Sequence, residues 1–172
     1  YDFTDVQLLP KPYQSNVPIF IAANPRVGAV DEEKIDKILR RVAKYGDGWQ
    51  ADSISVDVFR ERCRRLAEYV TADGRDSSKF ESCLHIMVNI NEDHSKALSE
   101  ADDYLSLYYG KGYITPERAQ DWVAYGSPTE VYEKIQEYVE AGCTMPVLRF
   151  VSPNLKLQLD RCINEVLPMF ES

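Results

Sequence analysis

The loop after the first apolar run of the chain carries residue types suited to binding an anion. Asn24 offers an amide, Arg26 a guanidinium that can hold a phosphate by two hydrogen bonds, and Gly28 a backbone that a ligand can approach closely. A helix is expected to begin just after this loop, and the free N–H groups of a helix start favour anions. The acidic run 31–33 at that start opposes a phosphate, so a plain capped connection is the alternative.

A second group of candidates lies at the next apolar run, where Trp49 is followed by Gln50 and Asp52. An indole can form one wall of a site for a flat ring, and the neighbouring polar groups can bond to the edge of that ring. A tryptophan within a strand equally fits the core, so both placements stay open for Trp49. We assign Trp49 to cofactor binding and Asp52 to substrate binding.

The later runs supply the remaining candidates. Asn89 and Ser152 come at the ends of predicted strands and could contact a substrate there. Arg149 stands inside the run PVLRFV, where a charge must point to a ligand site, pair with a carboxylate or face solvent at an edge. His85 alternates with apolar neighbours in its strand, and it is the catalytic candidate, with a packed or hydrogen-bonded histidine as the alternative.

Several common catalytic motifs are missing from the sequence. It contains no GxGxxG, no phosphate-binding P-loop, no GxSxG elbow and no HExxH or paired Cys/His spacing. Dinucleotide folds, kinases, serine hydrolases and zinc enzymes therefore have no local support, and we predict no metal site. The cysteines are far apart and are expected to be buried free thiols: Cys63, Cys83, Cys143 and Cys162.

Four apolar runs, each followed by a helical pattern, predict the elements that position these residues: 18–23, 47–51, 80–90 and 146–151. The run 18–23 has no polar alternation, which is typical of a strand covered on both faces. Right-handed crossovers make such strands parallel neighbours, and ligands bind at their carboxyl ends. After the third strand, Asn91 is expected to cap a helix that ends near Gly110. More than one helix is thus expected before the fourth strand, and the extra one is short, at 116–124.

Length and charge bound the class of protein. A chain of 172 residues fits a single α/β domain spanning 1–172, which is short of the roughly 250 residues of a complete barrel. The 28 acidic residues outnumber the 20 basic ones, so no nucleic-acid or membrane partner is expected. The cytoplasm is the default compartment. Tyr1 in first place fits a trimmed or truncated chain, with a processed start as the alternative.

Two segments look peripheral. The arginines of the helix after Trp49, at 60, 62, 64 and 65, interleave with glutamates and predict a solvated helix face rather than a nucleic-acid surface. Residues 1–17 contain Pro10 and Pro12 and read as an extended lead-in that lies over the domain.

Three stretches resemble a known family: IFIAANP, then RRVAKYGDGW, then GSPTEVYEKIQEYVEAG. In this order and at this spacing they are similar to the second half of the luciferase-like flavin monooxygenases, a family that includes deazaflavin-dependent reductases. The resemblance covers nearly all 172 residues. Family members are eight-stranded (β/α) barrels, and the resemblance implies a half-barrel of about four βα units, strands five to eight.

The resemblance also implies a function. The whole protein would be an oxidoreductase that uses reduced FMN and oxygen to oxidise a small organic substrate, with a separate flavin reductase as a partner. A deazaflavin-dependent oxidoreductase is the alternative within the family, and a non-catalytic half-barrel or assembly module is the alternative outside it. The loop of Asn24, Arg26 and Gly28 corresponds to one that contributes to the flavin site in related enzymes, and Arg149 completes the cofactor candidates. We expect little turnover from these 172 residues alone.

Four parallel strands of a barrel leave two open edges and an uncovered inner face. Both features favour association, so we expect a homo-oligomer.

Overall fold

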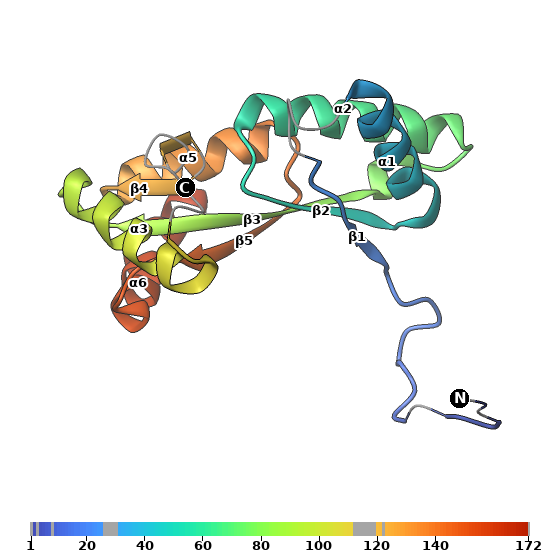
Figure 1. Cartoon of the computed structure of the whole chain (residues 1–172), viewed down its shortest axis with the longest axis horizontal. Helices are drawn as coiled ribbons and strands as arrows, with labels where there is room; N and C mark the ends of the chain where they lie inside the picture. The colour runs from blue at the N-terminus through green and yellow to red at the C-terminus, as the bar shows by residue number, and fades with distance from the viewer. Residues whose placement is uncertain are drawn as a thin grey trace.

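The computed structural model describes residues 2, 4–7, 9–25, 31–111, 120, 121 and 123–171. They form one parallel sheet of five strands with helices packed against it (Figure 1). The strands are β1 (Phe20–Ala22), β2 (Gly48–Asp52), β3 (Glu81–Ile90), β4 (Val123–Gly126) and β5 (Met145–Phe150). The α-helices are α1 (Glu32–Tyr45), α2 (Val56–Ala72), α3 (His94–Tyr109), α5 (Pro128–Glu140) and α6 (Leu155–Arg161). A 3₁₀ turn (Ser77–Lys79) precedes β3, and a π turn (Cys162–Val166) and a 3₁₀ turn (Leu167–Phe170) extend α6.

The long strand β3 organises the sheet because it pairs with β2, β4 and β5. Its partners overlap differently: β2 pairs with residues 81–85, β4 with 87–90, and β5 with 83–88. Since a strand has only two edges, β2 and β4 must share one edge of β3 while β5 takes the other. Among the described residues, β1, β4 and β5 each keep one edge without a partner strand.

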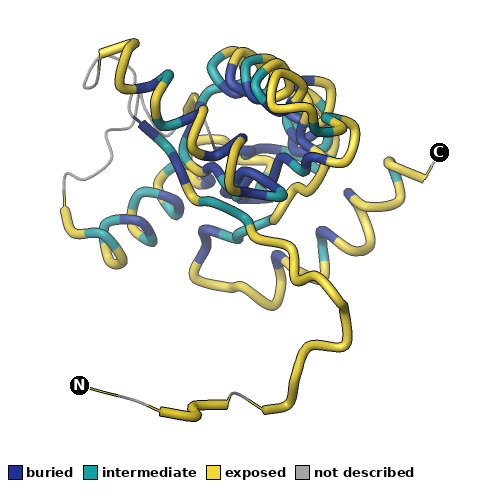
Figure 2. The backbone as a smooth tube through the Cα atoms, turned by 90° about the vertical axis from the view of Figure 1, so that its right-hand side faces the viewer, coloured by how far each residue is buried: buried dark blue, intermediate teal, exposed yellow. Residues whose placement is uncertain are grey.

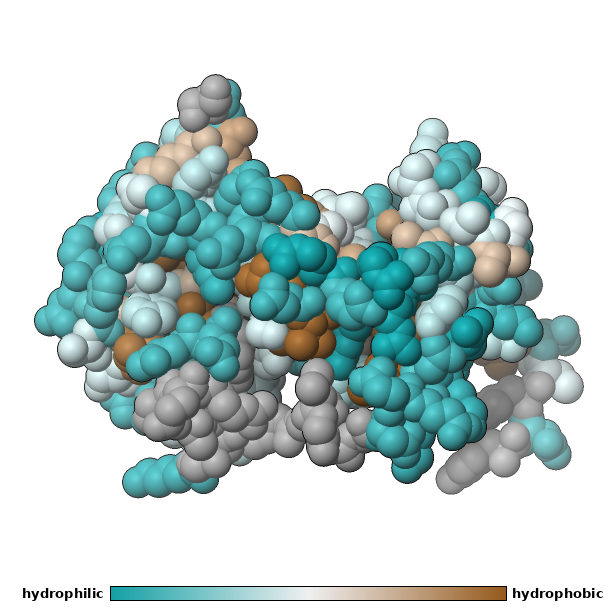
Figure 3. Space-filling view, turned by 90° about the horizontal axis from the view of Figure 1, so that it is seen from above, coloured by the Kyte–Doolittle hydropathy of each residue, from teal (hydrophilic) through white to brown (hydrophobic). Residues whose placement is uncertain are grey.

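The sheet has a helix-covered face and an opposite face that is only partly covered. Side chains of β3 at 84, 86, 88 and 90 belong to the main core beneath α1, α2 and α5. Met87 points the other way and packs against Ala101 and Leu105 of α3, near the carboxyl end of the sheet (Figure 1). We call the rest of that second side the open face, defined by Ala22, Gln50, Asp52, His85, Val147 and Arg149. Seen from the helix-covered side, the molecule is largely hydrophilic (Figure 3).

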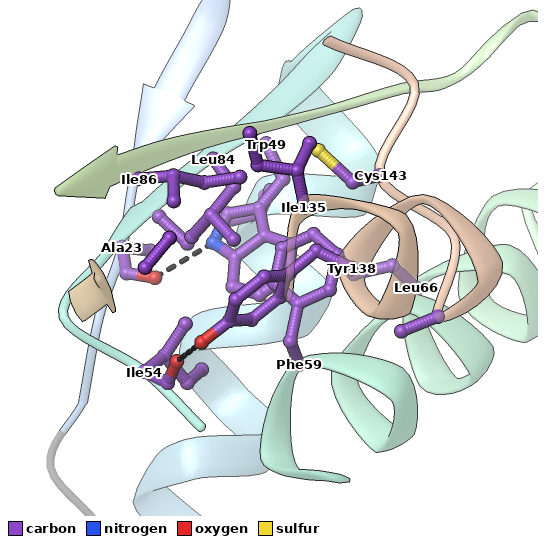
Figure 4. Close-up of a cluster of buried hydrophobic side chains, with 14 of the residues drawn as sticks. Ala23, Trp49, Ile54, Phe59, Leu66, Leu84, Ile86, Ile135, Tyr138 and Cys143 are labelled. Carbon is purple, nitrogen blue, oxygen red and sulfur yellow. Dashed lines mark hydrogen bonds between the residues drawn. The ribbon is translucent and has the colours of Figure 1, made fainter. Parts of the chain in front are cut away.

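The main core is built around one tryptophan. Trp49 is fully buried and stacks on Phe59 of α2 with ring centroids 5.1 Å apart (Figure 4). Its indole Nε1 donates to the backbone oxygen of Ala23 at 2.7 Å. Tyr138 of α5 meets Phe59 edge-on and donates to the oxygen of Ile54 at 2.7 Å (Figure 4). One aromatic cluster thus joins β2 to the loops at the carboxyl ends of β1 and β2.

Helix starts follow the capping signals of the sequence. Ser127 and Glu130 form a reciprocal capping box at α5. Hydrogen bonds from Ser127, and His94 beside them, lower the pKa of the Glu130 carboxyl to about 2. At α1, Asp31 accepts a hydrogen bond from the backbone of Lys34.

Several sequence-based expectations about the elements are wrong. β4, at Val123–Gly126, was not expected at all; a helix was expected to run through 124, and only Gln120 and Asp121 of it are described as helical. β4 has four residues, too few for its apolar pattern to stand out beside a proline-initiated helix signal. The runs 18–23 and 146–151 form the edge strands β1 and β5, as expected for the open edges of a half-barrel. Their burial is less than their apolar composition indicates, because β1 is half-buried and β5 is exposed over its first half.

The lead-in does not lie over the domain. Every described residue from 2 to 19 is exposed, and the segment projects away from the sheet as an arm (Figures 1 and 2). Leu9 and Tyr13 are among its exposed apolar side chains. Its prolines and lack of periodicity correctly indicate an extended backbone, but they say nothing about what an extended segment contacts.

Gly142 gives the first prediction. It joins α5 to β5 with φ of +106°, and an added Cβ would lie 3.2 Å from the Cβ of Cys63. Left-handed strain costs a β-branched residue on the order of 1–3 kcal/mol, and crowding adds to it, so Gly142→Val is expected to lower the melting temperature. Gly110→Val is the control, because Gly110 has φ of +95° and open space around it. Equal losses in the two variants would contradict a role for Cys63.

Candidate functional site

Three polar side chains lie together on the open face, two near the carboxyl end of β2 and one in the middle of β3. Asp52 pairs in register with His85, so the two point to the same side of adjacent strands. Gln50 belongs to the same face, and its Nε2 lies 3.2 Å from Nε2 of His85. His85 therefore has a hydrogen-bonding partner and remains only partly buried. Gln50, Asp52 and His85 form what we call the rim cluster.

A hydrogen-bond network that runs from the buried Arg62 through the half-buried Asn24 holds the exposed Asp52. The side-chain Nδ2 of Asn24 donates to Asp52 Oδ1 at 2.9 Å and also to the Asp52 backbone oxygen. Arg62 of α2 donates from Nη1 to Asn24 Oδ1 at 2.9 Å and from Nη2 to the backbone oxygen of Pro25. The loops that follow β1 and β2 are thereby tied to each other and to α2.

Asn89 and Ser152 also lie close together, but their side chains are buried and do not form part of the surface. Both contact the same oxygen of Glu100 on α3: Asn89 Nδ2 at 3.1 Å and Ser152 Oγ at 3.0 Å. Asn89 also donates to the oxygen of Val151 at 2.9 Å. Both side chains are buried, and Asn89 Oδ1 has no hydrogen-bond partner among the described residues. A donor reaching this oxygen, from a ligand or an ordered water, would satisfy it.

Arg149 lies at the free edge of the open face among tyrosines of α3. Its Nη1 is 2.9 Å from the hydroxyl of Tyr109, and its guanidinium carbon stands 4.5 Å from the ring centre of Tyr108. Burial disfavours its charge, but the contacts with Tyr109 and Tyr104 outweigh that effect, so the pKa of Arg149 is raised. No carboxylate lies within ion-pair distance of Arg149 among the described residues, so its charge is open to an anionic ligand.

Trp49 does not belong to the site. It is fully buried on the helix-covered side of β2, so it cannot stack on a ligand at the open face. The expectation of cofactor contact by Trp49 is therefore contradicted by its place in the fold. From the sequence alone, an indole in an apolar run fits both the core and a cofactor site. The pairing of β2 with β3 determines which face of the sheet it points to.

The loop candidates Arg26 and Gly28 lie outside the described residues. The helix start beyond them is described: Asp31 caps α1, and Glu32 and Glu33 follow in the first turn. These carboxylates occupy or oppose the positive end of the helix, so the start of α1 is a poor phosphate site.

Sequence reasoning missed two residues near the site. Arg62 was expected on a solvated helix face, yet it is 3% exposed. Its position, three residues after Phe59 and four before Leu66 on the buried face of α2, was the available signal. Glu100 fell between the apolar positions of α3, and nothing in the pattern marks it as a partner of Asn89 and Ser152.

Other kinds of site have no support in the part of the chain that the structure describes. There, no three His, Cys, Asp or Glu residues are grouped so as to hold a metal ion. None of the described helices combines the length and apolarity needed to span a bilayer. The four cysteines are free thiols, and burial raises the pKa of Cys63 and of Cys143 to about 11, which makes both poor nucleophiles.

Comparison with known proteins gives relatives of two related chemistries. The chain is 23% identical over 188 residues to the F420-dependent glucose-6-phosphate dehydrogenase of Kineococcus radiotolerans, covering 98% of this chain and 52% of that protein. An F420-dependent secondary alcohol dehydrogenase in complex with an F420-acetone adduct superposes with a TM-score of 0.75 at 18% identity, over 92% of this chain and 50% of that one. The long-chain alkane monooxygenase LadA gives a TM-score of 0.54 at 18% identity, over 77% and 38%.

The chain thus spans about half the length of the curated relative that it matches. Its parallel sheet is consistent with part of the barrel of these proteins, as the sequence resemblance implies. A family model for luciferase-like monooxygenases matches residues 1–145. The chain belongs to the luciferase-like monooxygenase family.

Proposed function

We propose that the protein is a flavin-dependent oxidoreductase that uses reduced FMN and oxygen to oxidise a small organic substrate. The observation that carries this proposal is the rim cluster, three polar side chains on the open face at the carboxyl end of β2 and beside it on β3. Ligands of parallel α/β sheets bind at the carboxyl ends of the strands, and the resemblance to the luciferase-like family implies a cofactor of the flavin type.

The described residues fit the ring of such a cofactor better than its phosphate. The amide of Gln50, the imidazole of His85 and the carboxylate of Asp52 offer donors and acceptors to the edge of a flat ring or to a polar substrate. The start of α1 carries its own carboxylates, so an anionic group of the cofactor would not bind there. Arg149, at the edge of the open face, is a cation that could bind such a group. When bound, a reduced flavin supplies the electrons for the reaction.

The protein's own groups have binding and proton-handling roles. The imidazole of His85 can pass a proton to or from a bound group, and Gln50 fixes one of its ring nitrogens by the contact at 3.2 Å. Asp52 lies beside it on the same face and can orient a hydroxyl or amine of the substrate. The apolar side chains Ala22 and Val147 flank these groups on the neighbouring strands. In the whole protein, a separate reductase would supply the reduced flavin.

A second candidate is hydride transfer with a deazaflavin cofactor, which needs no oxygen. The two F420-dependent relatives favour it. In this reading His85 would take the proton of an alcohol as the hydride leaves its carbon.

Titration separates these candidates. The purified chain is mixed with FMN and, separately, with a deazaflavin, and cofactor absorbance and fluorescence are followed with matched His85→Ala protein as the control. Saturable binding of FMN that His85→Ala weakens supports the first candidate, and selective binding of the deazaflavin supports the second. Binding of neither would support the non-catalytic half-barrel.

Arg149→Ala gives the second prediction. In a form of the protein that binds cofactor or substrate, we expect the loss of Arg149 to weaken that binding by about 1–3 kcal/mol, the range for a charge-assisted hydrogen bond. Arg60→Ala is the control, because Arg60 is an exposed cation paired with Asp57 on α2. Unchanged affinity in a correctly folded Arg149→Ala protein would assign Arg149 to packing against the tyrosines alone.

A further inference from the structure

Arg62 is an unusual buried charge. Its side chain is 3% exposed, and burial lowers the pKa of its guanidinium. Among the described residues no carboxylate lies within ion-pair distance of it, and the five residues 26–30 of the adjacent loop include no acid. Its hydrogen bonds run to two neutral oxygens, Asn24 Oδ1 and the backbone oxygen of Pro25. Burying a cation without a carboxylate partner costs free energy, and these two hydrogen bonds indicate which group Arg62 orients.

The direction of the hydrogen bonds shows what is positioned. A guanidinium only donates, so Arg62 must face the oxygen of the Asn24 amide and not its nitrogen. The amide NH₂ of Asn24 is then forced toward Asp52, where it meets the carboxylate Oδ1 at 2.9 Å and the backbone oxygen. Reversal of the amide would set donor against donor at Arg62 and acceptor against acceptor at Asp52. The chain Arg62–Asn24–Asp52 therefore has one allowed polarity.

We propose that Arg62 is a positioning residue, which acts through the Asn24 amide to hold the Asp52 carboxylate at the rim cluster. The ligand that Asp52 orients rests on the proposed function, whereas the coupling of Arg62 to Asp52 does not. Asp52 is exposed on the open face, and without the relay its side chain would be free to rotate into solvent. The relay thus presents an acceptor of fixed direction to a hydroxyl or amine donor of a bound molecule.

A double-mutant cycle tests the coupling in the chain itself. Urea midpoints are measured for Arg62→Met, Asp52→Ala and the double variant, with Arg60→Met as the matched exposed control on α2. We expect the shift of the double variant to be clearly smaller than the sum of the single shifts, although Arg62 and Asp52 do not touch. Additive shifts would overturn the proposal. If Arg62→Met does not fold, Arg62→Gln replaces it in the same cycle.

A second readout separates positioning from simple support of the fold. The side-chain amide protons of Asn24 should exchange slowly with solvent in the wild type and quickly in Arg62→Met, whereas Arg62→Lys, which keeps a donor, should restore part of the protection. Unchanged exchange in a folded Arg62→Met protein would also overturn the proposal. If the wild type binds neither FMN nor a deazaflavin, the proposed function fails, while the cycle and the exchange rates still decide the role of Arg62.

Discussion

Replacing Trp49 by Ala is expected to lower the free energy of unfolding by about 3–5 kcal/mol, the range for removing a large buried aromatic side chain. Trp49 is fully buried, stacks on Phe59 at 5.1 Å and donates to the oxygen of Ala23 at 2.7 Å. Its removal would open a cavity under α2 and leave the Ala23 oxygen without that donor. Urea unfolding followed by circular dichroism measures the loss.

Trp49→Phe is the control for this prediction. It keeps an aromatic ring against Phe59 but cannot donate to Ala23, so a smaller loss is expected. A loss near zero for Trp49→Ala, together with a large loss of cofactor affinity, would contradict the placement of Trp49 in the core and restore it as a cofactor contact.

Two copies of this chain are expected to associate through the open face. The accessible surface is 10919 Å², against roughly 8,600 Å² for a compact monomer of this mass. The described residues from 2 to 19 are all exposed, and this arm continues into the edge strand β1. In such a dimer, two sets of β1, β2, β3 and β5 would provide the eight strands of a closed barrel, and rotation about the barrel axis would keep all strands parallel.

Val147→Lys tests this arrangement. Val147 is 36% exposed on the open face of the edge strand β5, where a lysine would be forced into the interface. Light scattering at micromolar concentration is expected to show a dimer for the wild type and for Leu107→Lys, a change at an exposed position of α3, and a monomer for Val147→Lys. A monomeric wild type, or a dimer that Val147→Lys leaves intact, would contradict the prediction.

The sequence predicts much of this fold because local signals and tertiary packing agree. The apolar run 80–90 became the central strand β3, and the capping box at Ser127 begins α5 where expected. The predictions fail where the structure of a segment depends on the strands that it pairs with. Edge position, not composition, leaves β1 and β5 partly exposed, and the short strand β4 depends on pairing with Met87–Ile90.

The candidate site divides in the same way. The sequence correctly indicated that Asp52, Asn89 and Ser152 lie at or near the ends of strands. It did not predict that Asp52 lies beside His85, or that Asn89 and Ser152 share Glu100. The sequence could not tell which face of β2 carries Trp49, because a shift of one residue in strand register moves a side chain from the core to the open face. Nor could it find Arg62 or Glu100, whose partners lie 38 and 11 residues away in the chain.

The central claim is that the open face at the carboxyl ends of the strands is the functional face. Chemical-shift mapping of the isotope-labelled chain during titration with FMN, and separately with a deazaflavin, tests it most directly. The claim predicts saturable changes in the side-chain signals of Gln50 and His85 and in the backbone of Asp52, with the helix-covered core around Trp49 unchanged. Chemical-shift changes centred on α1, α2 or α5, with no change at the rim cluster, would contradict the claim.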